Sequence, residues 1–176
     1  MNDQSGRRAA AAALLRRLAA LGYDCLLLLA ILFVGTLALL PLTGGEAIRP
    51  APGTVVYPAY RLYLALLALA YFGLAWTRRG QTLGMMAWGL RLCRADGGAI
   101  GWQVATLRFA IGLVLAAAAE FGLRIAFESS GPMRALGGVL CLPLVANFVW
   151  IAFDAERRSL QDLLSRMRML RTRLRA

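Results

Sequence analysis

The sequence contains no histidine and no lysine, and its three cysteines follow no paired spacing. Histidine is the commonest general base and the commonest metal ligand in proteins, so its absence removes both roles together. Cys25, Cys93 and Cys141 form no CxxC motif, which gives no support to a disulfide framework or a zinc site. The pair Gly84 and Gly89 lacks the Lys-Ser/Thr ending of a phosphate-binding loop. We therefore expect no enzyme activity, no cofactor and no metal site.

Charged residues are also scarce for a chain of this length. Only 16% of the 176 residues are charged, 60% are hydrophobic, and the mean hydropathy is +0.62. A soluble domain keeps about a quarter of its residues charged and interrupts its apolar runs. The composition therefore predicts a membrane protein.

The scarce charge is strongly basic. Twenty arginines against nine acidic residues give a net charge of +11. Such an excess can indicate nucleic-acid binding, but arginines grouped between apolar segments are what the positive-inside rule produces. The expected partner is therefore a lipid bilayer with anionic headgroups, and not nucleic acid.

Four segments are long and apolar enough to span a bilayer, which takes about 20 residues. They cover residues 18–40, 59–76, 109–127 and 135–153. The first resembles a signal peptide because arginines precede it, but it is long, contains Asp24 and lacks a convincing cleavage site, so we interpret it as a retained helix. The fold class is an all-α membrane protein, a bundle of about four transmembrane helices.

The arginines also predict the orientation. Sixteen of the 20 lie before the first span, between the second and third, or after the fourth. Because positive residues collect on the cytoplasmic side, we expect both termini in the cytoplasm and a multi-pass protein of the bacterial inner membrane.

Two short segments on the predicted inner side alternate apolar and polar residues. "LRLCR" and "AIGW" flank the turn residues "ADGG", which predicts a small cytoplasmic hairpin. The tail segment "RMRML" alternates as well. It could add a strand to the hairpin or form a basic amphipathic helix, and its length does not decide between them.

Asp24 is the most unusual residue of the first span. A carboxylate inside a spanning helix costs on the order of 2.5–3.5 kcal/mol on insertion scales, and it usually faces a protein interior or a wet cavity. Arg17 lies seven residues earlier, about two helical turns and about 10 Å along the same face. The two residues predict a polar stripe that enters the membrane from the inner side.

Asn147 is expected at a similar depth. Asp24 lies six residues inside the first span and Asn147 six residues before the end of the fourth, both about 9 Å from the inner boundary. Their oxygen atoms could coordinate a small cation together or hydrogen-bond each other.

Glu120 and Arg124 form a second polar pair, in the third span. Their i, i+4 spacing, with the acid first, favours an ion pair on one helix. We expect mutual neutralisation in the outer half of the membrane, with a role in an ion path as the alternative.

The sequence resembles the RDD family of bacterial membrane proteins, named for one arginine and two aspartates. Arg17 and Asp24 in "RRLAALGYD" match the first two letters, and Asp162 in "FDAERRSLQDLLS" matches the third. The segment "GQTLGMMAWGLRLCRADGGAIGWQVATLR" is similar to the family's stretch of threonine, spaced glycines, turn and arginine. The resemblance implies an RDD-like transmembrane domain at 16–170, between a cytoplasmic segment at 1–15 and a basic tail at 171–176.

The resemblance also implies a class of function. Some family members are implicated in exchanging sodium or other monovalent cations for protons. Burial disfavours charge on a carboxylate whereas a bound cation favours it, so Asp24 could bind either. The expected function is a small, homo-oligomeric transporter of monovalent cations and protons, with Asp24, Asn147, Arg17 and Asp162 as the site. The alternative is a non-catalytic membrane scaffold or accessory subunit, in which these residues hold the helices and tail together.

Overall fold

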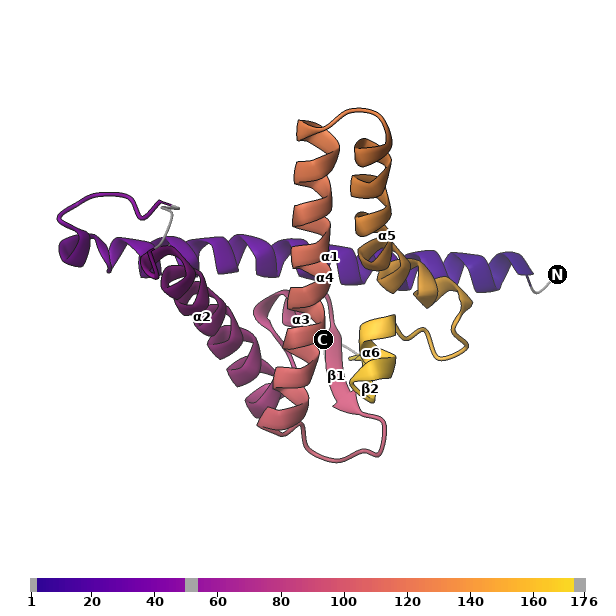
Figure 1. The fold of residues 1–176 in the computed structure, drawn as a ribbon. Helices are drawn as coiled ribbons and strands as arrows, with labels where there is room; N and C mark the ends of the chain where they lie inside the picture. The colour runs from indigo at the N-terminus through magenta and orange to yellow at the C-terminus, as the bar shows by residue number, and fades with distance from the viewer. Residues whose placement is uncertain (1–2, 50–53, 173–176) are drawn as a thin grey trace.

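The computed structural model describes residues 3–49 and 54–172 and is mostly helical. Four long helices dominate it (Figure 1): α1 (Asp3–Leu37), α2 (Val56–Arg79), α4 (Trp102–Glu128) and α5 (Pro132–Phe153). Each contains a stretch that can cross a membrane by length and composition, the first being Ala13–Leu37. The four predicted spans are confirmed. Residues 1–2 of the predicted N-terminal segment and 173–176 of the basic tail lie outside the described residues.

The connections from α1 to α2 and from α4 to α5 are short or irregular, as their glycines and prolines predict. A single turn of 3-10 helix, η1 (Leu40–Thr43), follows α1 and ends at Gly44, whose φ of 64° suits glycine. Residues 129–131 join α4 to α5. These two helices pack closely because Gly122 and Gly137 face each other, and a Cβ on either would lie 2.5 Å from the other residue's carbonyl oxygen.

Four short elements lie between α2 and α4 and after α5 along the chain. They are α3 (Leu83–Ala87), β1 (Leu90–Arg94), α6 (Leu160–Leu164) and β2 (Met167–Arg171). β1 pairs antiparallel with β2, in a register that places Leu92 opposite Met169. The predicted hairpin is therefore wrong: residues 99–101 form no strand, and Trp102 already begins α4. The tail segment supplies the partner strand instead, which decides the alternative left open for "RMRML".

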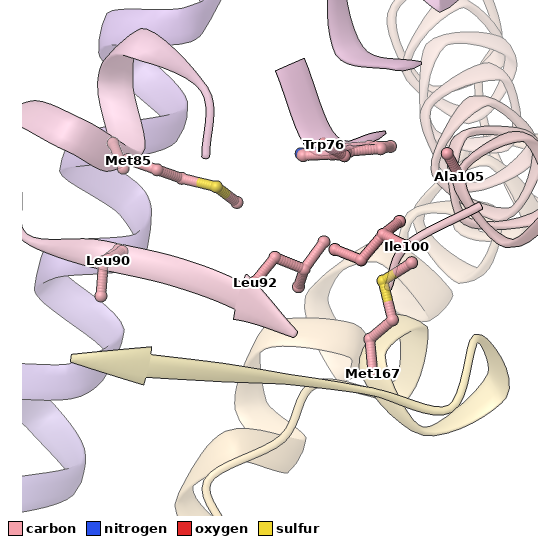
Figure 2. Packing of buried hydrophobic residues seen from close by; sticks show 8 residues of the cluster. Trp76, Met85, Leu90, Leu92, Ile100, Ala105 and Met167 are labelled. Atoms are coloured by element: carbon pink, nitrogen blue, oxygen red, sulfur yellow. The ribbon is translucent and has the colours of Figure 1, made fainter. Parts of the chain in front are cut away.

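The buried core lies around these short elements. Figure 2 shows Trp76, Leu92, Ile100 and Met167 converging from α2, β1, the loop before α4 and β2. The aliphatic alternation of the two strands supplies this core, because their inward residues are Leu90, Leu92 and Met167. The long helices instead leave most of their large apolar side chains exposed, as lipid-facing surfaces require.

Candidate functional site

Asp24 lies in α1 with only 4% of its surface exposed. Its Oδ1 atom accepts hydrogen bonds from the Tyr71 hydroxyl at 2.7 Å and from the Gly84 amide at 2.9 Å. Its Oδ2 atom accepts one from the Thr82 hydroxyl at 2.5 Å. The carboxylate thus ties α1 to α2 and to the start of α3.

The local sequence explains how α3 comes so close to α1. Thr82 is the N-cap of α3, and its hydroxyl oxygen also accepts a hydrogen bond from the Met85 amide at 3.1 Å. Gly84 has no side chain to separate the helices, since a Cβ there would lie 2.2 Å from the Ala20 carbonyl oxygen. Threonine and glycine in "QTLG" are therefore both needed to bring hydroxyl and amide donors to Asp24.

The surroundings of Asp24 are rich in oxygen and contain no described basic partner. The two carboxylate oxygens meet the hydroxyls of Tyr71 and Thr82, and the Ala20 carbonyl lies beside Gly84. Across residues 13–49 and 54–172, no arginine is hydrogen-bonded to this carboxylate. Hydroxyl groups can donate to an anion or offer lone pairs to a cation. The pocket has the donor set of a site for a proton or a hard monovalent cation.

Asp162 forms a separate, more highly charged cluster. Its side chain is fully buried, with its Oδ2 atom 2.5 Å from Arg17 Nη1 and its Oδ1 atom 2.6 Å from Arg108 Nη1. Asp162 also forms a reciprocal capping box with Ser159 at the start of α6. Arg17 comes from α1 and Arg108 from α4, so one carboxylate joins three helices.

This cluster keeps Asp162 ionised. Burial by itself raises the pKa of a carboxyl group, but the charges of Arg108 and Arg17, together with the Ser159 amide, outweigh burial and lower the pKa of Asp162 to about 2. The two guanidinium groups carry one positive charge more than the carboxylate balances. Arg108 also lies over the Trp76 ring, 5.5 Å from its centroid, which stabilises part of that excess.

The structure separates residues that the sequence grouped. Arg17 pairs with Asp162 and donates to the Arg157 carbonyl at 2.6 Å, and it makes no described hydrogen bond to Asp24. Asn147 is buried, but its Oδ1 atom accepts from the Gln161 amide at 2.8 Å and not from a group shared with Asp24. Arg17 and Asp24 therefore share a helix face but serve two different clusters.

Three contributors were not among the predicted site residues. Thr82 is the threonine of the stretch that resembles the family, but it was not assigned to a site. Tyr71 escaped notice because hydroxyl residues in apolar segments are common and carry no spacing signal. Arg108 was counted among the inner arginines and as the arginine that ends the same stretch, although an arginine six residues into α4 is also a detectable signal of a buried partner.

Glu120 and Arg124 do form an ion pair, at 2.7 Å, and Arg61 of α2 joins them at 3.5 Å. The three side chains are about half exposed or more. With Ala117 and Phe121 they line a surface hollow of about 210 Å³. In a helix that can cross a membrane, mutual neutralisation lowers the cost of placing these charges in the bilayer.

The fold and these clusters define a multi-pass membrane protein with four apolar helices, whose buried polar side chains gather around α3 and α6. The model of the RDD family matches residues 11–166, and the chain belongs to the RDD family. Comparison with curated proteins and with solved structures finds no match. Arg17, Asp24 and Asp162, which the resemblance predicted to be the family's arginine and two aspartates, lie in the two clusters described above.

Proposed function

We propose that this protein is a small transporter of the bacterial inner membrane that exchanges a monovalent cation for protons at Asp24. Its termini lie in the cytoplasm, as the sixteen inner arginines favour. Several copies assemble, because four helices alone enclose little space for a pathway. Asp24 binds the proton and the cation in turn.

One observation carries this proposal: Asp24 is a buried carboxylate whose hydrogen-bond donors, within the part of the chain that the structure describes, are all neutral. An ionised carboxylate in the membrane is stabilised by a cation, and protonation removes its charge altogether. Rotation of the Tyr71 and Thr82 hydroxyls would turn their lone pairs toward a cation. Competition between proton and cation at one carboxylate is the minimum that an exchanger needs.

The Asp162 cluster has a different role in this proposal. Its carboxylate is already neutralised by two arginines, and its low pKa keeps it ionised near neutral pH. It therefore holds α1, α4 and α6 together as a frame and does not exchange protons.

A scaffold or accessory subunit is the second candidate. The contact between Asp24 of α1 and the start of α3 favours it. The same three hydrogen bonds that prepare a cation site also dock α3 on α1. In a scaffold they would have no other purpose, and Asp24 would not respond to ions.

Cation binding by the purified protein separates the two candidates. We expect the melting temperature in detergent to rise with sodium chloride at constant ionic strength, choline chloride being the balancing salt, because a ligand of the folded state stabilises it. The rise should weaken as pH falls, since protons compete. It should vanish in Asp24→Asn and persist in Asp96→Asn, which changes an exposed acid. No rise in the wild type, or an equal rise in Asp24→Asn, would support the scaffold.

A further inference from the structure

Two stretches of the chain repeat each other 77 residues apart. Residues 82–94 read "TLGMMAWGLRLCR" and residues 159–171 read "SLQDLLSRMRMLR". Each begins with a hydroxyl N-cap and a leucine and ends in an aliphatic–arginine–aliphatic pattern with a final arginine. The secondary structure repeats without any shift, because α3 and α6 begin 77 residues apart and so do β1 and β2.

The strand pairing has the symmetry expected of two equivalent copies. At the centre, Leu92 lies opposite Met169, its own counterpart. Toward the ends, Leu90 lies opposite Arg171, and Arg94 lies opposite Met167. A rotation of 180° that exchanges the two strands turns the first pair into the second. Figure 2 shows the two arrows running in opposite directions. A two-fold axis through the centre of the ribbon therefore relates β1 to β2.

Hydrogen bonds and backbone angles obey the same relation. The Thr172 amide donates to the Gly89 carbonyl at 2.8 Å, and its counterpart Ala95 donates to the Arg166 carbonyl at 3.0 Å. Gly89 and Arg166 are counterparts and have φ angles of 62° and 52°. The N-cap hydroxyls of Thr82 and Ser159 each accept from an amide three residues later, both at 3.1 Å.

The long helices extend the repeat with a shift of 88 residues. Gly84 packs against the Ala20 carbonyl and Asp24 of α1, while its counterpart Gln161 bonds the Arg108 carbonyl at 2.7 Å and lies over Gly112 of α4. The inward positions of α1 and α4 agree with this shift: Arg17, Ala20 and Asp24 match Ala105, Arg108 and Gly112. Contacts across the halves are also paired, because α2 packs on α4 and α5 packs on α1.

We propose that the chain is a tandem repeat of one helix–helix–short helix–strand unit, and that its second half holds a dormant counterpart of the Asp24 pocket. The buried charges are among the positions at which the two halves differ. Asp24 corresponds to Gly112, Asp162 to Met85, and Arg17 to Ala105.

The dormant pocket is formed by Gly112, Ser159 and residue 161. Ser159 supplies a hydroxyl where the first half has Thr82, and the residue 161 amide stands where the first half has the Gly84 amide. In place of a carboxylate from the long helix, the Gln161 side chain fills the space: a Cβ on Gly112 would lie 2.8 Å from Gln161 Nε2. Asn147 accepts from the Gln161 amide as Asp24 accepts from the Gly84 amide. A carboxylate at position 112 and a glycine at 161 would reproduce the carboxylate and glycine of the Asp24–Gly84 contact.

The full-length double variant Gly112→Asp/Gln161→Gly tests this equivalence without relying on transport. Gly112→Asp alone crowds the Gln161 amide, and Gln161→Gly alone loses the bond to the Arg108 carbonyl. Together they copy the Asp24–Gly84 pair, so the melting temperature should fall less than the sum of the single falls, by at least about 3 °C. Ala116→Asp/Gln161→Gly is the matched control, because it places the acid one turn further along α4. In this control, the fall in melting temperature of the double variant should equal the sum of the falls of its two single variants.

If Gly112→Asp does not purify, the fraction of each variant that stays soluble after detergent extraction and heating gives the comparison. The double variant should exceed Gly112→Asp in that fraction. Additive effects at position 112, a double variant no better than Gly112→Asp, or equal coupling at position 116 would each overturn the proposal. Sodium binding by the wild type bears on the proposed function alone, so either idea can fail without the other.

Discussion

Asp24 and Asp162 are both buried carboxylates, but the groups that hydrogen-bond to them differ in charge. Asp162 faces two guanidinium groups, which compensate its charge in place. Asp24 faces hydroxyl and amide donors and has no charged hydrogen-bond partner among the residues whose side chains the structure describes. The sequence shows where each aspartate lies relative to the apolar segments. It does not show which distant residues surround each carboxylate, because those contacts form only in the folded chain.

The first residue-scale prediction concerns acid stability. An aspartate in an unfolded chain has a pKa of about 3.9, whereas the arginines lower the pKa of Asp162 to about 2. Its contribution, roughly 2–3 kcal/mol, is therefore full above about pH 4 and is lost as pH falls toward 2. Asp162→Asn lacks this contribution and leaves both arginines uncompensated, so it should be less stable at pH 6. The gap in unfolding free energy from the wild type should narrow between pH 5 and pH 2.5. A gap that is independent of pH would contradict the ion-pair assignment.

The second residue-scale prediction concerns the contact between α3 and α1. A Cβ on Gly84 would meet the Ala20 backbone oxygen at 2.2 Å, and a backbone atom cannot move aside cheaply. Gly84→Ala should therefore destabilise the protein by about 1–3 kcal/mol, measured by thermal unfolding in detergent. Gly22→Ala on α1 meets nothing within 4 Å and should be neutral or slightly stabilising. Similar stabilities of the two variants would mean that α3 does not pack on α1 in this way.

At the scale of elements, the long helices could be predicted from sequence and the strand pairing could not. A span is defined by about 20 consecutive residues, so composition alone locates it. The partner strand of "LRLCR" depends on which distant segments the fold brings together. The nearby "AIGW" has the alternation and the preceding turn of a hairpin strand, but the observed partner begins at Met167, 73 residues after Arg94. Ile100 of that predicted strand contributes to the core as a loop residue instead. Capping at Thr82 and Ser159 is local as well, but five-residue helices give too little periodicity to detect.

Disulfide cross-linking tests this pairing. On a cysteine-free background, Leu92→Cys/Met169→Cys should form a disulfide under mild oxidation, because opposite residues of antiparallel strands bring their Cβ atoms to about 4.5–5.5 Å. Cys93 kept as the native residue together with Ile100→Cys, the pair that a hairpin with its turn at 95–98 would place opposite each other, should remain reduced. Cross-linking of the second pair in place of the first would restore the hairpin.

At the scale of the whole molecule, the sequence identified the arginine and two aspartates but not their arrangement. Arg17 and Asp24 lie on one face of one helix, which suggested a single cluster. The separation into two clusters depends on α3 and α6, which insert different partners along that face: α3 brings Thr82 to Asp24, and α6 brings Asp162 to Arg17. Such insertions follow from the chain path and leave no mark on the spacing within α1.

Membrane orientation is the prediction at this scale. Because sixteen arginines lie on one side of the four spans, both termini should be cytoplasmic. On the cysteine-free background, a cysteine at Glu46 or Ser130 should react with an impermeant thiol reagent added outside intact cells, and a cysteine at Asp96 should react only after lysis. The reverse pattern would invert the topology, and labelling of all three from one side would exclude four spans.

The most direct test of the central claim is transport by the purified protein in proteoliposomes carrying an internal pH indicator. An inward sodium gradient should drive protons out of vesicles that contain the wild type. Asp24→Asn, reconstituted at equal density and with an unchanged chromatographic profile, should give no such movement, while Asp96→Asn should behave as the wild type. Proton movement that is equal in Asp24→Asn and the wild type, or absent from the wild type under every monovalent cation gradient, would contradict the assignment of Asp24 as the exchange site.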